Sequence, residues 1–129
     1  MEPYVKLHLS VFSEQNMFSG YGAGYVTVNK TRHEQSLIVL PDRLIENWDA
    51  KTFEQLTAKH FELVLSLQPE MVLFGTGATL RFPHPALTRI LIESHIGVEV
   101  MDTAAACRTY NILTAEGRRV AAALLIQPE

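Results

Sequence analysis

A polar stretch in the last third of the chain carries the residue types best suited to binding. Asp102 and Thr103 stand directly before three alanines, and Arg108 follows them. Asp and Thr cap helix N-termini, and an arginine can hold a carboxylate or a phosphate through two hydrogen bonds. Small residues leave room either for a ligand or for a closely packed backbone. In the packed alternative, Arg108 pairs with a neighbouring acid such as Glu116 or Glu99.

Two glycines follow a short apolar run at residues 71–74. Gly75 and Gly77 flank Thr76, and glycines placed after a strand can let the backbone approach a bound phosphate. The motif is incomplete, because no third glycine follows and no Gly-Lys-Ser/Thr sequence is present. The simpler alternative is a tight strand-to-loop turn that needs positive φ.

Cys107 is the only cysteine, which excludes an internal disulfide and a cysteine-rich zinc site. A nucleophilic thiolate is favoured at the first turn of a helix, whereas Cys107 falls in the middle of the expected helix. Free cysteine is also among the most buried residue types. We therefore expect a structural Cys107, and an enzyme that uses Cys107 or Asp102 is the least favoured function.

The five histidines lie at positions 8, 33, 60, 84 and 95, and no two have metal-ligand spacing. No carboxylate pair indicates glycosidase-like chemistry, and no Gly-x-Ser-x-Gly motif occurs. We expect no catalytic residue, no metal and no cofactor. His84, close to the glycine turn, is the one histidine worth testing, and a plain loop residue is its simpler interpretation.

Strand and helix patterns alternate in the second half of the chain. The expected elements are a helix over 58–68 with Thr57 as its N-cap, a strand over 71–74, a helix opened by Pro83-His84-Pro85 and ended by Gly97, a strand over 98–101, a helix over 104–115 and a strand over 120–126. This order predicts parallel strands. Their carboxyl ends then share one sheet edge, which places the Gly75–Gly77 turn beside the Asp102–Thr103 cap.

The first half of the chain is strand-like. Alternation from Val5 to Val11 predicts a half-buried strand, and residues 25–28 and 36–40 predict a hairpin around a polar turn. Residues 45–53 predict a further short strand. The Gly20–Gly24 segment is either a mobile, partner-facing loop or a bulged connection between strands. The expected fold class is α/β, a compact single domain over residues 1–129 with three layers: a central mixed sheet, a β-α-β-α-β C-terminal half and an additional N-terminal β layer.

Composition limits the classes of partner. The chain has 129 residues, 47% hydrophobic and 19% charged, with 11 Lys plus Arg against 14 Asp plus Glu. The resulting net charge of −3 indicates neither a nucleic-acid surface nor an anionic-membrane surface. The chain start lacks a signal-peptide pattern, and the longest apolar run, over residues 120–126, is too short to span a bilayer. We expect a soluble cytoplasmic protein.

Several segments together resemble one known family. They are Gly75-Thr76-Gly77, the run from Gly97 to Thr103, the run from Ala105 to Asn111, and Glu116-Gly117-Arg118 before the apolar end. In order and spacing they resemble the domain-of-unknown-function family 498, which includes mitochondrial complex I assembly factor 3 and many small bacterial proteins. The resemblance implies a compact α/β fold with a mixed sheet and an extra β layer, and it carries over no enzyme activity or cofactor.

The resemblance favours a non-enzymatic protein-interaction or assembly module with a protein partner. The alternative is a protein that binds a small anion at the Gly75–Gly77 turn and the Asp102–Arg108 helix start. The motif positions define a candidate binding surface: Gly75, Thr76, Gly77, Asp102, Thr103, Cys107, Arg108, Asn111, Glu116 and Arg118.

Overall fold

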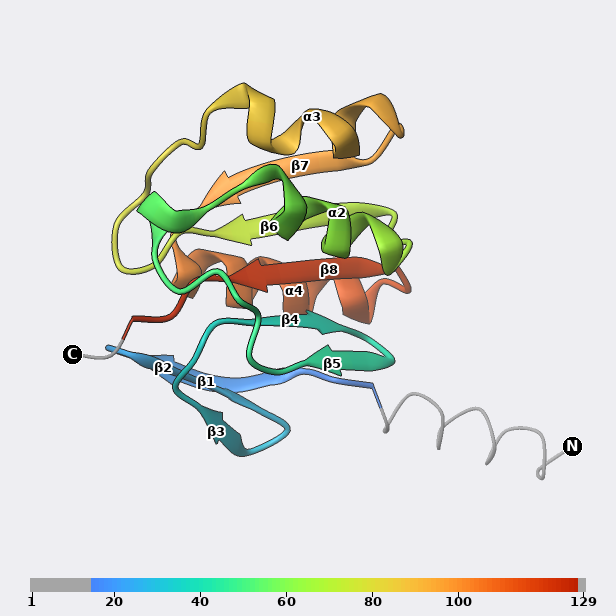
Figure 1. Ribbon diagram of the computed structural model, residues 1–129. Coiled ribbons are helices and arrows are strands. Elements are labelled where there is room, and N and C mark those ends of the chain that lie inside the picture. The colour runs from blue at the N-terminus through green and yellow to red at the C-terminus, as the bar shows by residue number, and fades with distance from the viewer. Residues whose placement is uncertain (1–14, 128–129) are drawn as a thin grey trace, which may run out of the picture.

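The computed structural model describes residues 15–127, in which the strands form two sheets (Figure 1). The expected strand over Val5–Val11 lies outside the described residues. The elements in chain order are β1 (Phe18–Gly22), β2 (Tyr25–Val28), β3 (Thr31–His33), β4 (Leu37–Leu40), β5 (Arg43–Ile45), the short 3-10 helix η1 (Phe53–Gln55), α2 (Ala58–Ser66), β6 (Met71–Gly75), α3 (Pro85–Glu93), β7 (Gly97–Met101), α4 (Thr103–Ala115) and β8 (Val120–Leu124).

The larger sheet is mixed and has the strand order β5-β4-β8-β6-β7. Strand β6 pairs in parallel with both β7 and β8, as the β-α-β-α-β order predicts. Strand β4 pairs antiparallel with β8 and β5. The three strands of the C-terminal half therefore end at the same edge, which we call the carboxyl edge.

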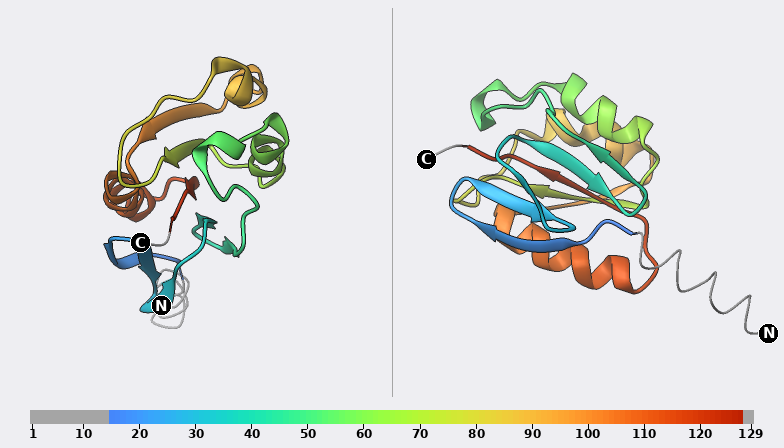
Figure 2. Two further views of the ribbon diagram at one scale, coloured as in Figure 1. Left: turned by 60° about the vertical axis from the view of Figure 1, so that its left-hand side comes forward. Right: turned by 90° about the horizontal axis from the view of Figure 1, so that it is seen from below.

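Three layers make up the described part of the molecule. Helices α2 and α3 cover one face of the five-stranded sheet, and α4 covers the other face together with the β1-β2-β3 sheet (Figure 2). Alternate residues of a strand point to opposite faces. On β8, Ala121 and Ala123 thus enter the core beneath α2 and α3, whereas Ala122 and Leu124 enter the core beneath α4. The α/β three-layer prediction is confirmed.

The predicted hairpin between residues 25–28 and 36–40 is wrong. Strand β2 instead turns back at Asn29 and Lys30 and pairs with β3, inside the segment expected to be a turn. Both turn residues have positive φ, 49° and 72°, as a tight hairpin turn requires. No glycine marks this turn, so the sequence offered a weak signal for it. Strand β4 joins the larger sheet.

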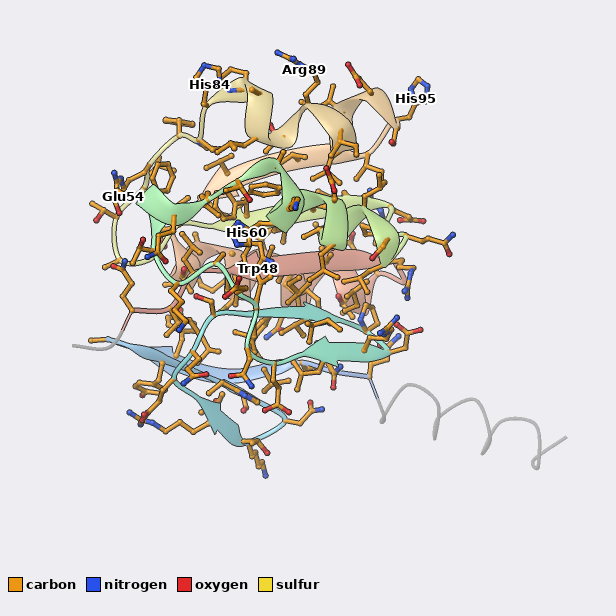
Figure 3. The ribbon with its side chains drawn as sticks, in the orientation of Figure 1. Trp48, Glu54, His60, His84, Arg89 and His95 are labelled. Atoms are coloured by element: carbon orange, nitrogen blue, oxygen red, sulfur yellow. The ribbon has the colours of Figure 1, made fainter. Side chains whose placement is uncertain are left out.

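The predicted strand over residues 45–53 is also wrong. Strand β5 ends at Ile45, and the chain then leaves the sheet at Asn47, whose φ is +57°. Trp48 is 2% exposed, and its ring packs edge-on against His60 and Phe61 (Figure 3). Burial of the indole in the core beneath α2, rather than strand pairing, positions this segment.

Two of the helices begin at N-caps that the sequence predicts. Asp102 caps α4, and its Oδ1 accepts the N–H of Ala105 at 2.8 Å. In each of the other two helices a histidine takes part in the cap. Thr57 is the N-cap of α2, as predicted, and its N–H donates to Nδ1 of His60 at 2.9 Å. His84 is the N-cap of α3, and the Ala86 N–H donates to its Nδ1 at 3.0 Å. Each cap satisfies a backbone donor that the helix itself leaves free.

The end of α3 differs from the prediction. Ser94 is the C-cap, His95 takes the left-handed conformation with φ of +64°, and Gly97 begins β7. His95 is exposed and lies on the outer side of the helix layer (Figure 3). Within residues 15–127, none of the helices combines the length and the apolar character that crossing a membrane requires.

Candidate functional site

The carboxyl edge brings the glycine turn and the α4 cap together. Thr76 N–H donates to the Met101 carbonyl at 2.9 Å, and Thr103 N–H donates to the Gly77 carbonyl at 2.9 Å. The Thr103 hydroxyl accepts the Gly77 N–H at 2.8 Å and donates to the Leu125 carbonyl at 3.0 Å. Thr103 therefore ties the ends of β6 and β8 to the start of α4, as the parallel topology predicts.

The two glycines of the turn have different roles. A Cβ on Gly75 would lie 2.8 Å from Leu124 Cδ2 and 3.0 Å from Thr103 Cα, so Gly75 allows close packing of α4 on the sheet. Gly77 instead has φ of +97° and open space at its Cβ position. Positive φ at a strand-to-loop turn is thus needed at Gly77.

A pocket of about 240 Å³ opens at the carboxyl edge. Four segments line it: Tyr21–Tyr25 from the β1–β2 hairpin, Gly77–Ala78, Asp102–Ala104 and Leu125–Gln127. The Gly20–Gly24 segment is part of β1 and its hairpin turn, with a register irregularity between Phe18 and Gly20. The hairpin forms one wall of the pocket, and the sequence alone did not place it there.

The start of α4 has few free donors for an anion. A helix leaves its first four N–H groups without internal partners. Here the Thr103 N–H is bonded to the Gly77 carbonyl and the Ala105 N–H to Asp102 Oδ1. The Ala104 N–H has no hydrogen-bond partner within residues 15–127, and it lies next to the Asp102 carboxylate. This arrangement disfavours the small-anion alternative, because the carboxylate would repel the ligand.

Arg108 does not pair with Glu116 or Glu99, contrary to the packed alternative. Its Nη1 donates to the Tyr21 hydroxyl at 2.9 Å, and its Cζ lies 5.8 Å from the centre of the Tyr21 ring. The hydrogen bond to Tyr21 raises the pKa of Arg108. An exposed arginine of α4 thus holds the tyrosine that forms part of the pocket wall.

Cys107 faces the core beneath α4 and is fully buried. Burial raises the pKa of its thiol to about 12, an effect that nearby Arg108 opposes and Asp102 reinforces. A thiol with so high a pKa keeps its proton at neutral pH, so it lacks the thiolate form that a nucleophile needs. The position fits a structural Cys107. Among residues 15–127, no group of three His, Cys, Asp or Glu side chains could hold a metal ion.

Tyr110 and Asn111 fasten the start of β1 to α4. The Asn111 side chain accepts the Phe18 N–H at 2.9 Å and donates to the Phe18 carbonyl at 2.8 Å, so it completes the hydrogen bonds of that residue. The Tyr110 hydroxyl donates to the Asn16 carbonyl at 2.9 Å. Burial raises the pKa of Tyr110 well above its usual range. Asn111 thus contributes to the candidate region by holding the wall of the pocket.

Glu116 and Arg118 lie away from the other candidate residues. They follow the last turn of α4, which is about 20 Å long from its 13 residues. Arg118 Nε pairs with Glu70 Oε1 at 3.1 Å, beside the start of β6. The structure therefore separates these two residues from the Gly75–Gly77 turn and from Asp102.

The loop after the glycine turn carries exposed apolar side chains that sequence reasoning missed. Phe82 is 74% exposed and Leu80 is 48% exposed. The Thr76 hydroxyl holds the loop, because it donates to the Thr79 carbonyl at 2.6 Å and accepts the Arg81 N–H at 3.1 Å. Two large apolar residues on either side of a charged one, Leu80-Arg81-Phe82, are the sequence signal that could have identified this loop.

Arg81 attaches the same loop to η1. Its guanidinium pairs with Glu54 at 2.8 Å and lies over the Phe53 ring, 4.1 Å from the ring centre. Hydrogen bonding to Arg81 lowers the pKa of Glu54, which Figure 3 shows on η1. The apolar residues on either side of Arg81 are thereby presented outward, next to the pocket region.

Comparison with known proteins assigns the chain to a family. Residues 18–125 match the family described as "Protein of unknown function (DUF498/DUF598)". The chain is 31% identical over 126 residues to NADH dehydrogenase (ubiquinone) 1 alpha subcomplex assembly factor 3 of Mus musculus. The alignment covers 96% of this chain and 68% of that relative.

Solved structures agree with this assignment. A crystal structure of a Bordetella parapertussis protein has a TM-score of 0.83 and 39% identity, and it covers 88% of this chain and 97% of its own. An NMR structure of a Xanthomonas campestris protein has a TM-score of 0.75 and 38% identity, with 85% of each chain covered. The fold, the motifs and these similarities together show that the chain belongs to the DUF498/DUF598 family.

Proposed function

We propose that this protein is a non-enzymatic interaction module that assists the assembly of a protein complex, and that it contacts its partner through the carboxyl edge. The observation that carries the proposal is the family membership, with a relative named as a complex I assembly factor aligned over 96% of this chain. The buried thiol of Cys107 supports a role without covalent chemistry, because it offers no activated nucleophile.

The shape and polarity of the carboxyl edge support its use as a contact surface. Phe82 and Leu80 extend into solvent from a loop that hydrogen bonds and an ion pair hold in place. Exposed aromatic side chains on a fixed loop are typical anchors of protein–protein interfaces. The pocket beside this loop adds a concave feature, so a partner can be recognised by shape as well as by apolar contact.

A capture experiment tests the proposal. The full chain is immobilised, incubated with an extract of its own cells, and the bound proteins are quantified by mass spectrometry. We expect a partner that wild type enriches, that Phe82→Ser loses at least fivefold, and that Ile112→Ser retains. Ile112 is a matched control, because it is also a largely exposed apolar residue, 61% accessible, but lies on α4. Equal recovery with all three proteins would refute the carboxyl edge as the contact surface.

A further inference from the structure

We propose that the pocket at the carboxyl edge receives a cationic side chain, lysine or arginine, of the partner protein, and that Asp102 pairs with it. This inference rests on the proposed function, because it specifies the chemistry of the partner at the same surface. It follows from the charge, the hydrogen bonds and the size of the pocket.

The pocket lining holds one carboxylate and no lysine, arginine or histidine. Of the residues from Tyr21–Tyr25, Gly77–Ala78, Asp102–Ala104 and Leu125–Gln127, only Asp102 is charged at neutral pH. Its Oδ1 accepts the Ala105 N–H, whereas Oδ2 has no hydrogen-bond partner within residues 15–127. No cation of the described residues lies within 4.0 Å of this carboxylate. A partly buried carboxylate with a free oxygen attracts a cationic hydrogen-bond donor.

Two features near the pocket oppose the binding of a cation, and both are weak. The helix dipole favours a negative ligand at the start of α4, but the N–H groups of Thr103 and Ala105 there already have partners. Arg108 would repel a cation, but it is exposed, lies outside the pocket lining and donates to the Tyr21 hydroxyl. Water and salt screen the charge of such an exposed group. The carboxylate is therefore the dominant charge that a ligand in the pocket meets.

The size of the pocket favours a single side chain over a larger ligand. Sites for drug-sized molecules and cofactors are commonly about 300–1,000 Å³, whereas this pocket has about 240 Å³. Tyr21 at its wall is 39% exposed, and the Leu80 and Phe82 side chains lie on the neighbouring loop. A partner segment can thus place its cation in the pocket while apolar residues beside it cover this loop.

Small matched probes test the charge preference without the partner. The probes are arginine and lysine capped as N-acetyl methylamides, together with the capped forms of citrulline, a neutral arginine isostere, and of glutamate. Binding is followed by shifts of the backbone amide NMR signals of Gly22, Gly24, Gly77 and Ala104. We expect saturable shifts with the two cations, binding of citrulline about fivefold weaker than that of arginine, and no shifts with glutamate. Shifts of equal size with glutamate or citrulline would overturn the proposal, as would no shifts with either cation.

Two variants then test the role of the carboxylate. Asp102→Asn keeps a good helix cap and removes the charge, and Glu116→Gln removes one charge at the opposite end of α4. An ion pair at a partly exposed site changes affinity by up to about fivefold, so we expect Asp102→Asn to weaken capped arginine by that factor and Glu116→Gln to leave its affinity unchanged. Equal affinity for Asp102→Asn and wild type would overturn the pairing.

A further probe separates a free amine from a protein side chain. Binding of n-butylammonium without binding of either capped amino acid would show that the pocket admits a small amine but no residue of a chain, and would overturn the assignment. Failure of these titrations is distinguishable from failure of the proposed function. A partner that Phe82→Ser loses would still support the interaction module, even if the pocket binds no cation.

Discussion

Replacing Thr103 by valine tests the reasoning about the carboxyl edge most directly. Valine has nearly the shape of threonine but lacks the hydroxyl, which accepts the Gly77 N–H at 2.8 Å and donates to the Leu125 carbonyl at 3.0 Å. The variant leaves both backbone groups without their partner. Both residues line the pocket, but Leu125 is 1% exposed, so water can hardly replace the lost donor there, whereas Gly77 is partly exposed.

The magnitude follows from these two environments. A buried polar group left unpaired costs about 1–3 kcal/mol, and a group that water can reach lies at the lower end of that range. We therefore expect Thr103→Val to lower the free energy of unfolding by about 3 kcal/mol, and the melting temperature by roughly 10 °C for a chain of this size. Urea denaturation followed by circular dichroism measures the loss, with an unchanged m value indicating the same unfolding reaction.

Thr103→Ser is the matched control, because serine keeps the hydroxyl and removes only the methyl group. We expect it to retain most of the stability, with a loss of about 1 kcal/mol or less, as for a partly exposed methyl group. Two results would refute the reasoning. One is an equal loss for both variants, and the other is a Thr103→Val protein within about 0.5 kcal/mol of wild type, the range of neutral surface substitutions.

Four further predictions concern packing, the thiol and an arginine. Gly75→Ala places a Cβ 3.0 Å from Thr103 Cα, and we expect this overpacking to lower stability by about 1–3 kcal/mol in urea denaturation. Cys107 should react with iodoacetamide at pH 8 at least about 100-fold more slowly than in the unfolded chain, because its thiol is buried and protonated. Its raised pKa also predicts that stability is unaffected below pH 9 and falls from there towards pH 12, by about 1.4 kcal/mol per pH unit, since only the unfolded chain then ionises. Arg119→Met should raise the pKa of Asp42, which its hydrogen bond now lowers, as NMR titration would show.

Each of these predictions has a control in the same chain. Gly97 has open space at its Cβ position, so Gly97→Ala should change stability by less than about 0.5 kcal/mol. Cys107→Ala should lack the loss of stability above pH 9 that the thiol causes. Arg119→Lys should restore only part of the effect on Asp42, because lysine lacks the planar fork of arginine. Rapid alkylation of folded Cys107, or an alkaline stability profile shared by both proteins, would contradict the assigned burial.

Sequence reasoning was strongest where topology restricts the geometry. Once residues 71–74 and 98–101 are recognised as parallel strands, their carboxyl ends must meet, and the Gly75–Gly77 turn must lie beside Asp102. The hydrogen bond from Thr103 N–H to the Gly77 carbonyl confirms that juxtaposition. The N-cap of α4 was also predictable from the sequence, because Asp102 accepts a hydrogen bond from Ala105, only three residues further along the chain.

Sequence reasoning failed where the partner is far away in the chain or the turn lacks glycine. Tyr21 and Arg108 are 87 residues apart, and no local pattern links them. The Asn29–Lys30 turn uses two residues with side chains at positive φ, so the hairpin to β3 was missed and β4 was assigned to the wrong sheet. Trp48 was placed in a strand over residues 45–53, although burial of its indole in the core positions this segment.

The histidine caps of α2 and α3 have a consequence for the protonation of the molecule. A backbone N–H can only donate, so Nδ1 of His60 and Nδ1 of His84 must both carry a lone pair, and both rings are the neutral Nε2–H tautomer. A proton on either Nδ1 would set donor against donor and add a positive charge where the helix dipole opposes it. Helix α4, capped by a carboxylate, has no imidazole at its start. Two helix starts on one face of the larger sheet thus share one tautomer, which backbone hydrogen bonds set, and the nitrogen chemical shifts of the two rings would report it.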